Sequence, residues 1–333
     1  EDLTTRGRSR FNRDRGFRVS ERAQANLSSG ARLTFTAGLT ALEQLGNSRA
    51  PLIRGPMPFT DATTEGRAEG VFFIGPYDAE VEIDGNPYLT FGRFEADLEA
   101  ALLGFSHRLR PGVEFRKEWN SGPGYQFDIL YPPQVTFNGI RGFDRPRSYD
   151  DVPPLVTSAL YFDDQLTRSL GGDLLLTVQA GLRFDLLHGG SHWFSGVQDA
   201  ALQPRLNVEL SPRRWLRFRA GWGKVAKTPS LALFAPAPQW YDVVNVNWYT
   251  DEPEERLAVI TTFIEDPTNP DLGFAVGEKA EAGIEVGFGR SAISLVVFHD
   301  RITDGFGIRG TPSYLLRDHY DLADSTRGTG VPP

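Results

Sequence analysis

The chain has no cysteine among its 333 residues. This absence excludes disulfide bonds, thiolate metal sites and a cysteine nucleophile. It also suits a protein exposed to the periplasm, where free thiols are oxidised in pairs. The only methionine is Met57 and the first residue is Glu1, so we expect the sequence to be a processed product or an internal fragment.

The sequence also lacks any run of about 18 apolar residues, which excludes a transmembrane helix. Transmembrane strands stay open, because they need only about 9 to 11 residues of alternating polarity. The formal net charge is -8, and no stretch rich in lysine and arginine outweighs it. Nucleic acid is therefore not expected as a partner, because such binding depends on clustered positive charge.

Motifs that carry catalysis are missing as well. The sequence contains no Gly-x-Ser-x-Gly, no phosphate-binding glycine loop, no dinucleotide fingerprint and no His-Glu-x-x-His. Carboxylates are numerous but scattered, with no indication that two of them meet across a cleft. We therefore expect neither enzymatic activity nor a cofactor.

What the sequence does contain is strict alternation of apolar and polar residues. A helix would space its apolar residues by three and four, so this pattern predicts strands. The segments 31–41 and 174–186 show it over about 10 to 13 residues, a length that crosses a hydrocarbon layer when the strand is tilted. In the second segment the apolar face consists of Leu174, Leu176, Val178, Ala180, Leu182, Phe184 and Leu186.

The same reading predicts about ten strands along the chain. They are expected at 17–27, 31–41, 94–102, 109–119, 156–166, 174–186, 202–210, 216–222, 280–288 and 293–298. Short turns such as Ser28-Ser29-Gly30 join neighbouring strands. Much longer segments, expected to be loops, separate the hairpins. Short turns at one end and long loops at the other are typical of outer-membrane barrels.

Three stretches carry more specific motifs. Residues 202–230 hold a Pro-Arg-Leu strand, a short turn, and a Trp-Gly-Lys strand that leads to Lys227-Thr228-Pro229. Residues 269–288 begin with Asn-Pro-Asp-Leu and end in a glycine-containing strand, and residues 161–185 pair Tyr-Phe-Asp-Asp-Gln with Gly-Leu-Arg-Phe-Asp. In order and spacing these motifs resemble the barrel of TonB-dependent outer-membrane receptors, although that family often has Ala-Pro where this chain has Lys227-Thr228-Pro229.

The resemblance implies an all-β fold, namely an antiparallel transmembrane β-barrel with short periplasmic turns and long extracellular loops. The loops would be 43–90, 120–155 and 228–277. About ten strands are roughly half of the 22 or so in a plugged transporter barrel. Residues 1–333 are therefore expected to be a partial barrel that lacks the plug domain and the closing strands. Unpaired strand edges cannot face lipid. We therefore expect the native protein to contain either further residues of the same chain or additional chains.

The resemblance also implies active import across the bacterial outer membrane of a scarce nutrient, such as a siderophore, cobalamin, a glycan or a peptide. Loops would capture the substrate, and energy passed through TonB would rearrange the plug. Implied partners are outer-membrane lipid, lipopolysaccharide, the plug domain and TonB, the last through segments outside this chain. Two alternatives stay open: a passive porin, and a soluble all-β adhesin or glycan-binding module.

Candidate ligand-binding residues are concentrated in the segment 235–250. Aromatic rings bury a large area at little cost in conformational entropy, and amide side chains add hydrogen bonds. The alternatives are an interfacial aromatic girdle and ordinary loop packing. The candidates are Trp240, Tyr241, Asn245, Asn247, Trp248 and Tyr249.

Other polar features give weaker predictions. His188 and His192 lie among glycines without a third ligand, so no metal site is expected. A basic arm of arginines within residues 6–22 is expected either to contact lipopolysaccharide phosphates or to be a solvated loop. In a barrel, polar positions between the apolar ones face the plug or water. Those positions include Arg183, Asp185, Arg217 and Arg219.

Overall fold

The structure, a computed structural model, describes residues 9–28, 30–133, 135–137, 140–142, 145–189 and 196–307. Most of these residues lie in β-strands. The helices of the described chain are one α-helical turn, α1 (Leu231–Phe234), and one 3-10 turn, η1 (Pro253–Glu255). Within the described ranges, no helix has the length and apolar character needed to span a membrane.

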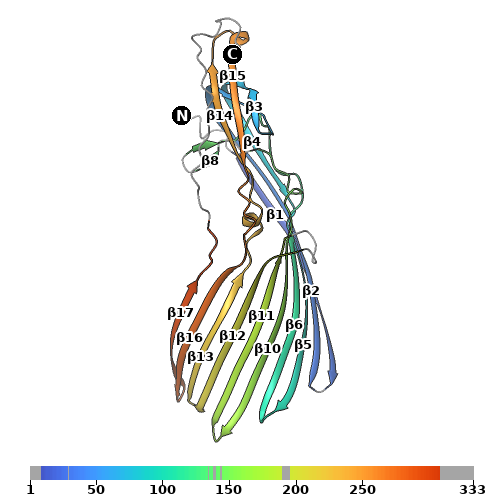
Figure 1. Cartoon of the computed structure of the whole chain (residues 1–333), viewed down its shortest axis with the longest axis vertical. Helices are drawn as coiled ribbons and strands as arrows, with labels where there is room; N and C mark the ends of the chain where they lie inside the picture. Colours follow the sequence, from blue (N-terminus) through green and yellow to red (C-terminus); the bar gives the residue numbers. More distant parts are fainter. Residues whose placement is uncertain are drawn as a thin grey trace.

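A 12-stranded antiparallel sheet forms most of the molecule (Figure 1). Its order is β17-β16-β13-β12-β11-β10-β6-β5-β2-β4-β7, and β1 pairs with the opposite edge of β2. The long strands are β1 (Ser9–Ser28), β2 (Ala31–Phe59), β4 (Val71–Gly85), β5 (Tyr88–Leu102), β6 (Phe105–Trp119), β10 (Leu155–Gly171), β11 (Leu174–His188), β12 (Val197–Arg213), β13 (Leu216–Lys227), β16 (Ala275–Phe288) and β17 (Ser291–Ile302). Every strand predicted from alternation lies inside one of these, which confirms the predicted all-β antiparallel class.

Short turns join the long strands at one end of the sheet, at the bottom of Figure 1. In the turn between β5 and β6, Leu103 and Gly104 have φ values of 54° and 77°. Two successive residues with positive φ match the right-handed twist of the flanking strands, which is the geometry of tight hairpins. Gly171 and Gly172 also have positive φ and connect β10 to β11 in the same way.

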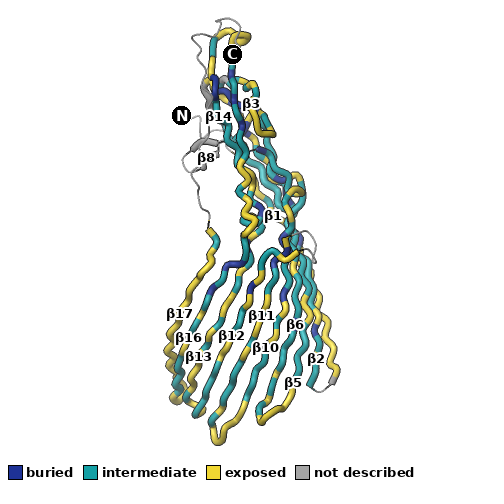
Figure 2. The backbone as a smooth tube through the Cα atoms, in the orientation of Figure 1, coloured by how far each residue is buried: buried dark blue, intermediate teal, exposed yellow. Residues whose placement is uncertain are grey.

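The sheet is a single layer, so its two faces differ only by the side chains that alternate along each strand. One face, called the apolar face here, carries large hydrophobic side chains that remain open to the surroundings: Leu160 is 56% exposed and Leu182 48% exposed. The other, called the polar face, carries Arg183 and Asp185. Figure 2 accordingly has little dark blue along the strands of the sheet. A soluble domain would cover such an apolar face.

The segments 43–90, 120–155 and 228–277 were predicted to be loops, and the structure corrects this: much of their length is strand. β2 continues to Phe59 and pairs along its second half with β4. A separate three-stranded sheet contains β14, β15 and β3. The further strands are β3 (Gly66–Glu69), β7 (Gly124–Phe127), β8 (Val135–Phe137), β9 (Ile140–Gly142), β14 (Gln239–Trp248) and β15 (Leu257–Glu265).

We call the described residues within 50–85, 120–155 and 228–274 the crown. The crown extends past the ends of the other long strands, at the end opposite the short turns (Figure 1), and it includes β4, β7 and the second half of β2. Buried apolar residues lie where the crown meets the long strands, including Leu155, Leu187, Ala201 and Phe274. Inside the crown, Ile260 is buried beneath Gly70, where a side chain would overlap its terminal methyl group.

Candidate functional site

The candidate ligand-binding residues lie on β14 or directly after it. β14 pairs antiparallel with β15, from Gln239 opposite Glu265 to Trp248 opposite Leu257. Successive side chains of a strand point to opposite faces, so Trp240 and Tyr241 cannot form one contact surface. A β-bulge between Val244 and Val246 interrupts the pairing. The expected aromatic loop is therefore a strand whose candidates are divided between two faces.

Trp240 is half-buried and packs against a buried ion pair. The guanidinium carbon of Arg145 lies 5.1 Å from the centroid of the Trp240 ring. Arg145 Nη2 lies 3.0 Å from Asp242 Oδ2, and Arg145 Nε donates a hydrogen bond to the carbonyl oxygen of Ala62 at 3.0 Å. Asp242 Oδ1 also accepts a 2.8 Å hydrogen bond from Thr262 Oγ1. This cluster joins β14, β15 and two loops, so Trp240 contributes to the stability of the crown.

Asn245 and Tyr249 are also engaged in packing. Asn245 is buried, and its Nδ2 donates a 2.6 Å hydrogen bond to Thr261 Oγ1. The Tyr249 ring lies edge-on to Phe72, with 5.5 Å between the ring centroids. The guanidinium carbon of Arg256 lies 4.7 Å from the Tyr249 centroid. These contacts agree with the alternative of ordinary packing for both residues.

Tyr241 lies on the other face of β14. Its hydroxyl donates a 2.6 Å hydrogen bond to Gln239 Oε1. Burial, together with the nearby carboxylate of Glu265, raises the pKa of Tyr241 above its ordinary value of 10.0. The phenol is therefore neutral at physiological pH and keeps its proton as a hydrogen-bond donor.

Asn247 and Trp248 are the exposed members of the candidate set, and Trp248 is 44% exposed. They lie at the end of β14, beside the turn that leads to β15. An accessible indole has a large apolar area and one N–H donor, which suits contact with an incoming ligand. Among the candidates, these two can therefore contact a ligand without any rearrangement of the crown.

The polar face of the long sheet carries a network of ion pairs. Sequence alternation predicted only that these charged side chains share one face. Arg183 Nε lies 2.8 Å from Asp185 Oδ1, and Arg183 Nη1 lies 3.5 Å from Glu114 Oε2. Glu114 also pairs with Arg93 at 2.7 Å. The chain of contacts therefore joins residues of β5, β6 and β11 and passes over β10, which lies between β6 and β11.

Asp163 is the centre of a second group on this face. Its side chain is 6% exposed and lies 2.7 Å from Arg205 Nη2 and 3.5 Å from Arg110 Nη2. Gln179 Nε2 donates to both of its carboxylate oxygens, at 3.2 and 3.1 Å. Gly181, on the neighbouring strand, leaves the space that the Arg205 side chain occupies. The polar face therefore carries two networks of paired charged groups rather than a set of separate solvated side chains.

The structure describes one of the two histidines and part of the basic arm. His188 is buried, and its Nε2 lies 2.8 Å from Ser158 Oγ, whereas His192 lies outside the described residues. In the part of the chain that the structure describes, no group of three or more His, Cys, Asp or Glu side chains could hold a metal ion. The described arginines of the arm, such as Arg13 and Arg18, lie on β1 and not in a loop.

Comparison with known proteins adds the family. A family model described as "TonB dependent receptor-like, beta-barrel" matches residues 2–324. The search of curated proteins gives no match. Among solved structures, the chain is similar to the RagAB peptide transporter, with a TM-score of 0.51 at 14% identity over 88% of this chain and 30% of that chain.

Two siderophore receptors from Pseudomonas aeruginosa are also similar. The receptor PirA has 17% identity and a TM-score of 0.42 over 86% of this chain and 46% of its own. The ferric enterobactin receptor PfeA has 14% identity and a TM-score of 0.45 over 87% of this chain and 42% of its own. The chain thus spans between 30% and 46% of the lengths of these three structures.

Proposed function

Because the chain belongs to the TonB-dependent receptor-like β-barrel family, we propose that it forms about half of the wall, and part of the ligand-capturing crown, of an active importer in the bacterial outer membrane. The family comprises transporters and receptors of that membrane. The observation that carries the proposal is the division of the long sheet into an open apolar face and a polar face of paired charges. A barrel wall needs both, one toward lipid and one toward the lumen.

The short turns face the periplasm in this proposal, and the crown faces the outside. Outer-membrane barrels have short periplasmic turns and longer extracellular segments, and the sheet has this asymmetry between its two ends. The apolar face then contacts outer-membrane lipid. The charged wall around Asp163 and Glu114 faces a plug domain that other parts of the protein supply, and TonB acts through those parts.

Further strands complete the barrel in this proposal. Among the described strands, β1 and β17 each pair on one side, with β2 and β16. Their outer edges would leave backbone N–H and C=O groups in lipid, where an unsatisfied group costs several kcal/mol. The chain covers 30% of the RagAB transporter chain, which supports the same conclusion.

The proposed substrate class is a scarce nutrient such as a siderophore, cobalamin, a glycan or a peptide. Trp248 and Asn247 are the residues proposed to make first contact, because both are exposed at the end of β14. Trp240, Tyr241, Asn245 and Tyr249 are proposed to position that end of the crown rather than to bind directly.

Uptake measurements test this function. Source cells with and without the gene would be given radiolabelled ferric siderophores, cobalamin and oligopeptides, with and without a protonophore. We expect deletion to abolish uptake of one class, the gene to restore it, and the protonophore to stop it. Gene-dependent uptake that persists in the protonophore would contradict active transport and indicate a passive porin.

A further inference from the structure

We propose that the apolar face of the sheet holds one phospholipid of the leaflet nearest the short turns, with an acyl chain in a shallow depression over β5, β6, β10 and β11 and its phosphate at Arg168. This goes beyond import, because it concerns the outside of the wall. It depends on the sheet spanning a bilayer but not on which nutrient is carried.

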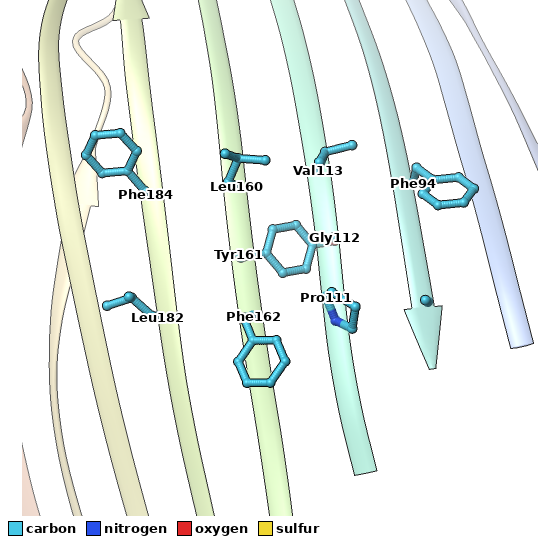
Figure 3. A pocket seen from close by; sticks show the side chains of 10 residues that line it. Phe94, Pro111, Gly112, Val113, Leu160, Tyr161, Phe162, Leu182 and Phe184 are labelled. Carbon is cyan, nitrogen blue, oxygen red and sulfur yellow. The ribbon is translucent and has the colours of Figure 1, made fainter. Parts of the chain in front are cut away.

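The depression is apolar and is formed by four adjacent strands. Its volume is about 410 Å³. Pro111 and Val113 of β6 and Leu160 and Phe162 of β10 lie between the side chains from β5 and β11, as Figure 3 shows. Ala96 also lines the depression. The larger side chains include Phe94, Leu160, Phe162, Leu182 and Phe184. Such a surface suits a hydrocarbon chain, which gains free energy in proportion to the apolar area it covers.

Arg168 lies on the same face, closer to the short turns. It pairs with Leu176, which belongs to the apolar face of β11. Its guanidinium carbon lies 5.0 Å from the centroid of Phe105, and the residue is exposed. Among the described residues, Arg168 has no carboxylate partner within an ion-pair distance. A positive charge held over a ring, and not neutralised by the protein, is suited to a phosphate.

The distance between the depression and Arg168 fits one lipid. From Phe162 to Arg168 the strand advances by six residues, or about 20 Å at about 3.3 Å per residue. With a strand tilt of about 40°, this is about 15 Å along the membrane normal. Half of a hydrocarbon core about 30 Å thick is also about 15 Å. The depression therefore lies near the middle of the bilayer when Arg168 lies at the edge of the hydrocarbon core, from where its side chain reaches the phosphates.

A polar pair lies on the apolar face between the depression and Arg168. The pair is His107 and Asp164, and Nδ1 of His107 lies 2.9 Å from Oδ2 of Asp164. The other polar atoms of the pair, Nε2 and Oδ1, are buried without a hydrogen-bond partner among the described residues. By the same rise, Asp164 lies about 5 Å along the normal from the level of Phe162 and about 10 Å from that of Arg168, so the pair lies within the hydrocarbon region. The hydrogen bond between the two side chains lowers the cost of placing them there.

Native mass spectrometry of the full-length receptor tests the proposal. The receptor would be purified from outer membranes in a mild detergent, delipidated, and titrated with phosphatidylglycerol. Arg168→Gln removes the charge, and Ala96→Trp fills the depression. The matched controls are Arg290→Gln, in the turn between β16 and β17, and Ala220→Trp, an exposed position on the apolar face of β13.

We expect the wild type and both controls to bind one phospholipid with the same affinity. Arg168→Gln should weaken binding about fivefold, the usual effect of one cation near a lipid surface, and Ala96→Trp should abolish it. Equal binding by all five proteins would overturn the proposal, as would a bound mass that matches lipid A in preparations that were not delipidated. Heat-modifiable mobility on a gel checks that each variant is folded, and Leu182→Trp replaces Ala96→Trp if the latter does not fold.

Discussion

Arg145 and Asp242 lie 97 residues apart in the chain and form an ion pair whose side chains are 4% and 10% exposed. The pair holds together parts of the crown that meet only in the folded protein. Trp240, the first of the candidate aromatic residues, stacks on this arginine. The crown is therefore a packed structure in its own right, and only its exposed positions remain available for ligands.

Removing one partner of this pair should loosen the crown. Asp242→Asn leaves the guanidinium of Arg145 buried without its counter-charge, which typically costs about 3–5 kcal/mol. Amide hydrogen exchange in β14 and β15 should accelerate about 100-fold or more, while exchange in β10 and β11 stays unchanged. The control is Asp173→Asn, because the pair of Asp173 with Arg214 at 3.3 Å is exposed and worth at most about 1 kcal/mol. Equal acceleration in both variants would contradict this role.

The two tryptophans of β14 should behave differently. Trp248→Ala should weaken substrate binding about 10-fold or more, as truncation of an exposed aromatic anchor does, without changing the melting temperature of the receptor. Trp240→Ala should instead lower the stability of the crown, because it removes the ring that packs on Arg145. Binding is measured by titration of the purified receptor with the substrate found in the uptake experiment. A loss of binding in Trp240→Ala alone, with stability intact, would reverse the assignment.

Residue 112 must be glycine because the Tyr161 ring occupies the space beside it. Gly112 lies opposite Tyr161 in the pairing of β6 with β10, and a side chain at residue 112 would overlap the Tyr161 ring. Gly112→Val should therefore destabilise the wall by about 1–3 kcal/mol, the usual cost of overpacking. The stability of the wall is measured as the temperature at which the heat-modifiable band of the folded barrel is lost on a gel.

A matched control for that substitution lies on the adjacent strand. Gly92→Val introduces the same side chain at a position with nothing within 4 Å, so its effect should be small. The double variant Gly112→Val with Tyr161→Ala should recover part of the loss, because the overlap is then removed. If Gly92→Val proves as harmful as Gly112→Val, strand glycines matter here for a reason other than the Tyr161 ring.

The orientation can be read with single cysteines, because these 333 residues contain none. Thr250→Cys lies in the crown and Ser291→Cys beside a short turn. An impermeant maleimide applied to intact cells should label Thr250→Cys and not Ser291→Cys, and permeabilised cells should show both. Labelling of Ser291→Cys alone in intact cells would invert the proposed orientation.

The long strands could be predicted from the sequence because alternation is a local signal. The run from Leu174 to Leu186 identifies β11 without knowledge of its partners. The crown strands could not be predicted in the same way. Pro51 and Pro56 interrupt the second half of β2 and favour a loop by local rules, yet this half is strand because β4 pairs with it.

The candidate site was predicted in part. Alternation identified the polar positions of the wall, including Arg183 and Asp185, but not the network that joins them across strands. Composition identified the aromatic segment, yet not which of its rings pack within the crown. The packing of Trp240 depends on Arg145. No sequence motif relates Arg145 to its distant partner Asp242. A contact between distant segments becomes visible only when the sheets are assembled.

The central claim is that this chain is part of the wall of a larger outer-membrane barrel. An immunoblot of fractionated source cells, with an antibody against this segment and with and without boiling, tests it most directly. We predict a detergent-dependent band in the outer membrane that shifts on heating and lies well above 37.0 kDa, at roughly twice that mass. A band at 37.0 kDa in the soluble fraction would contradict the account.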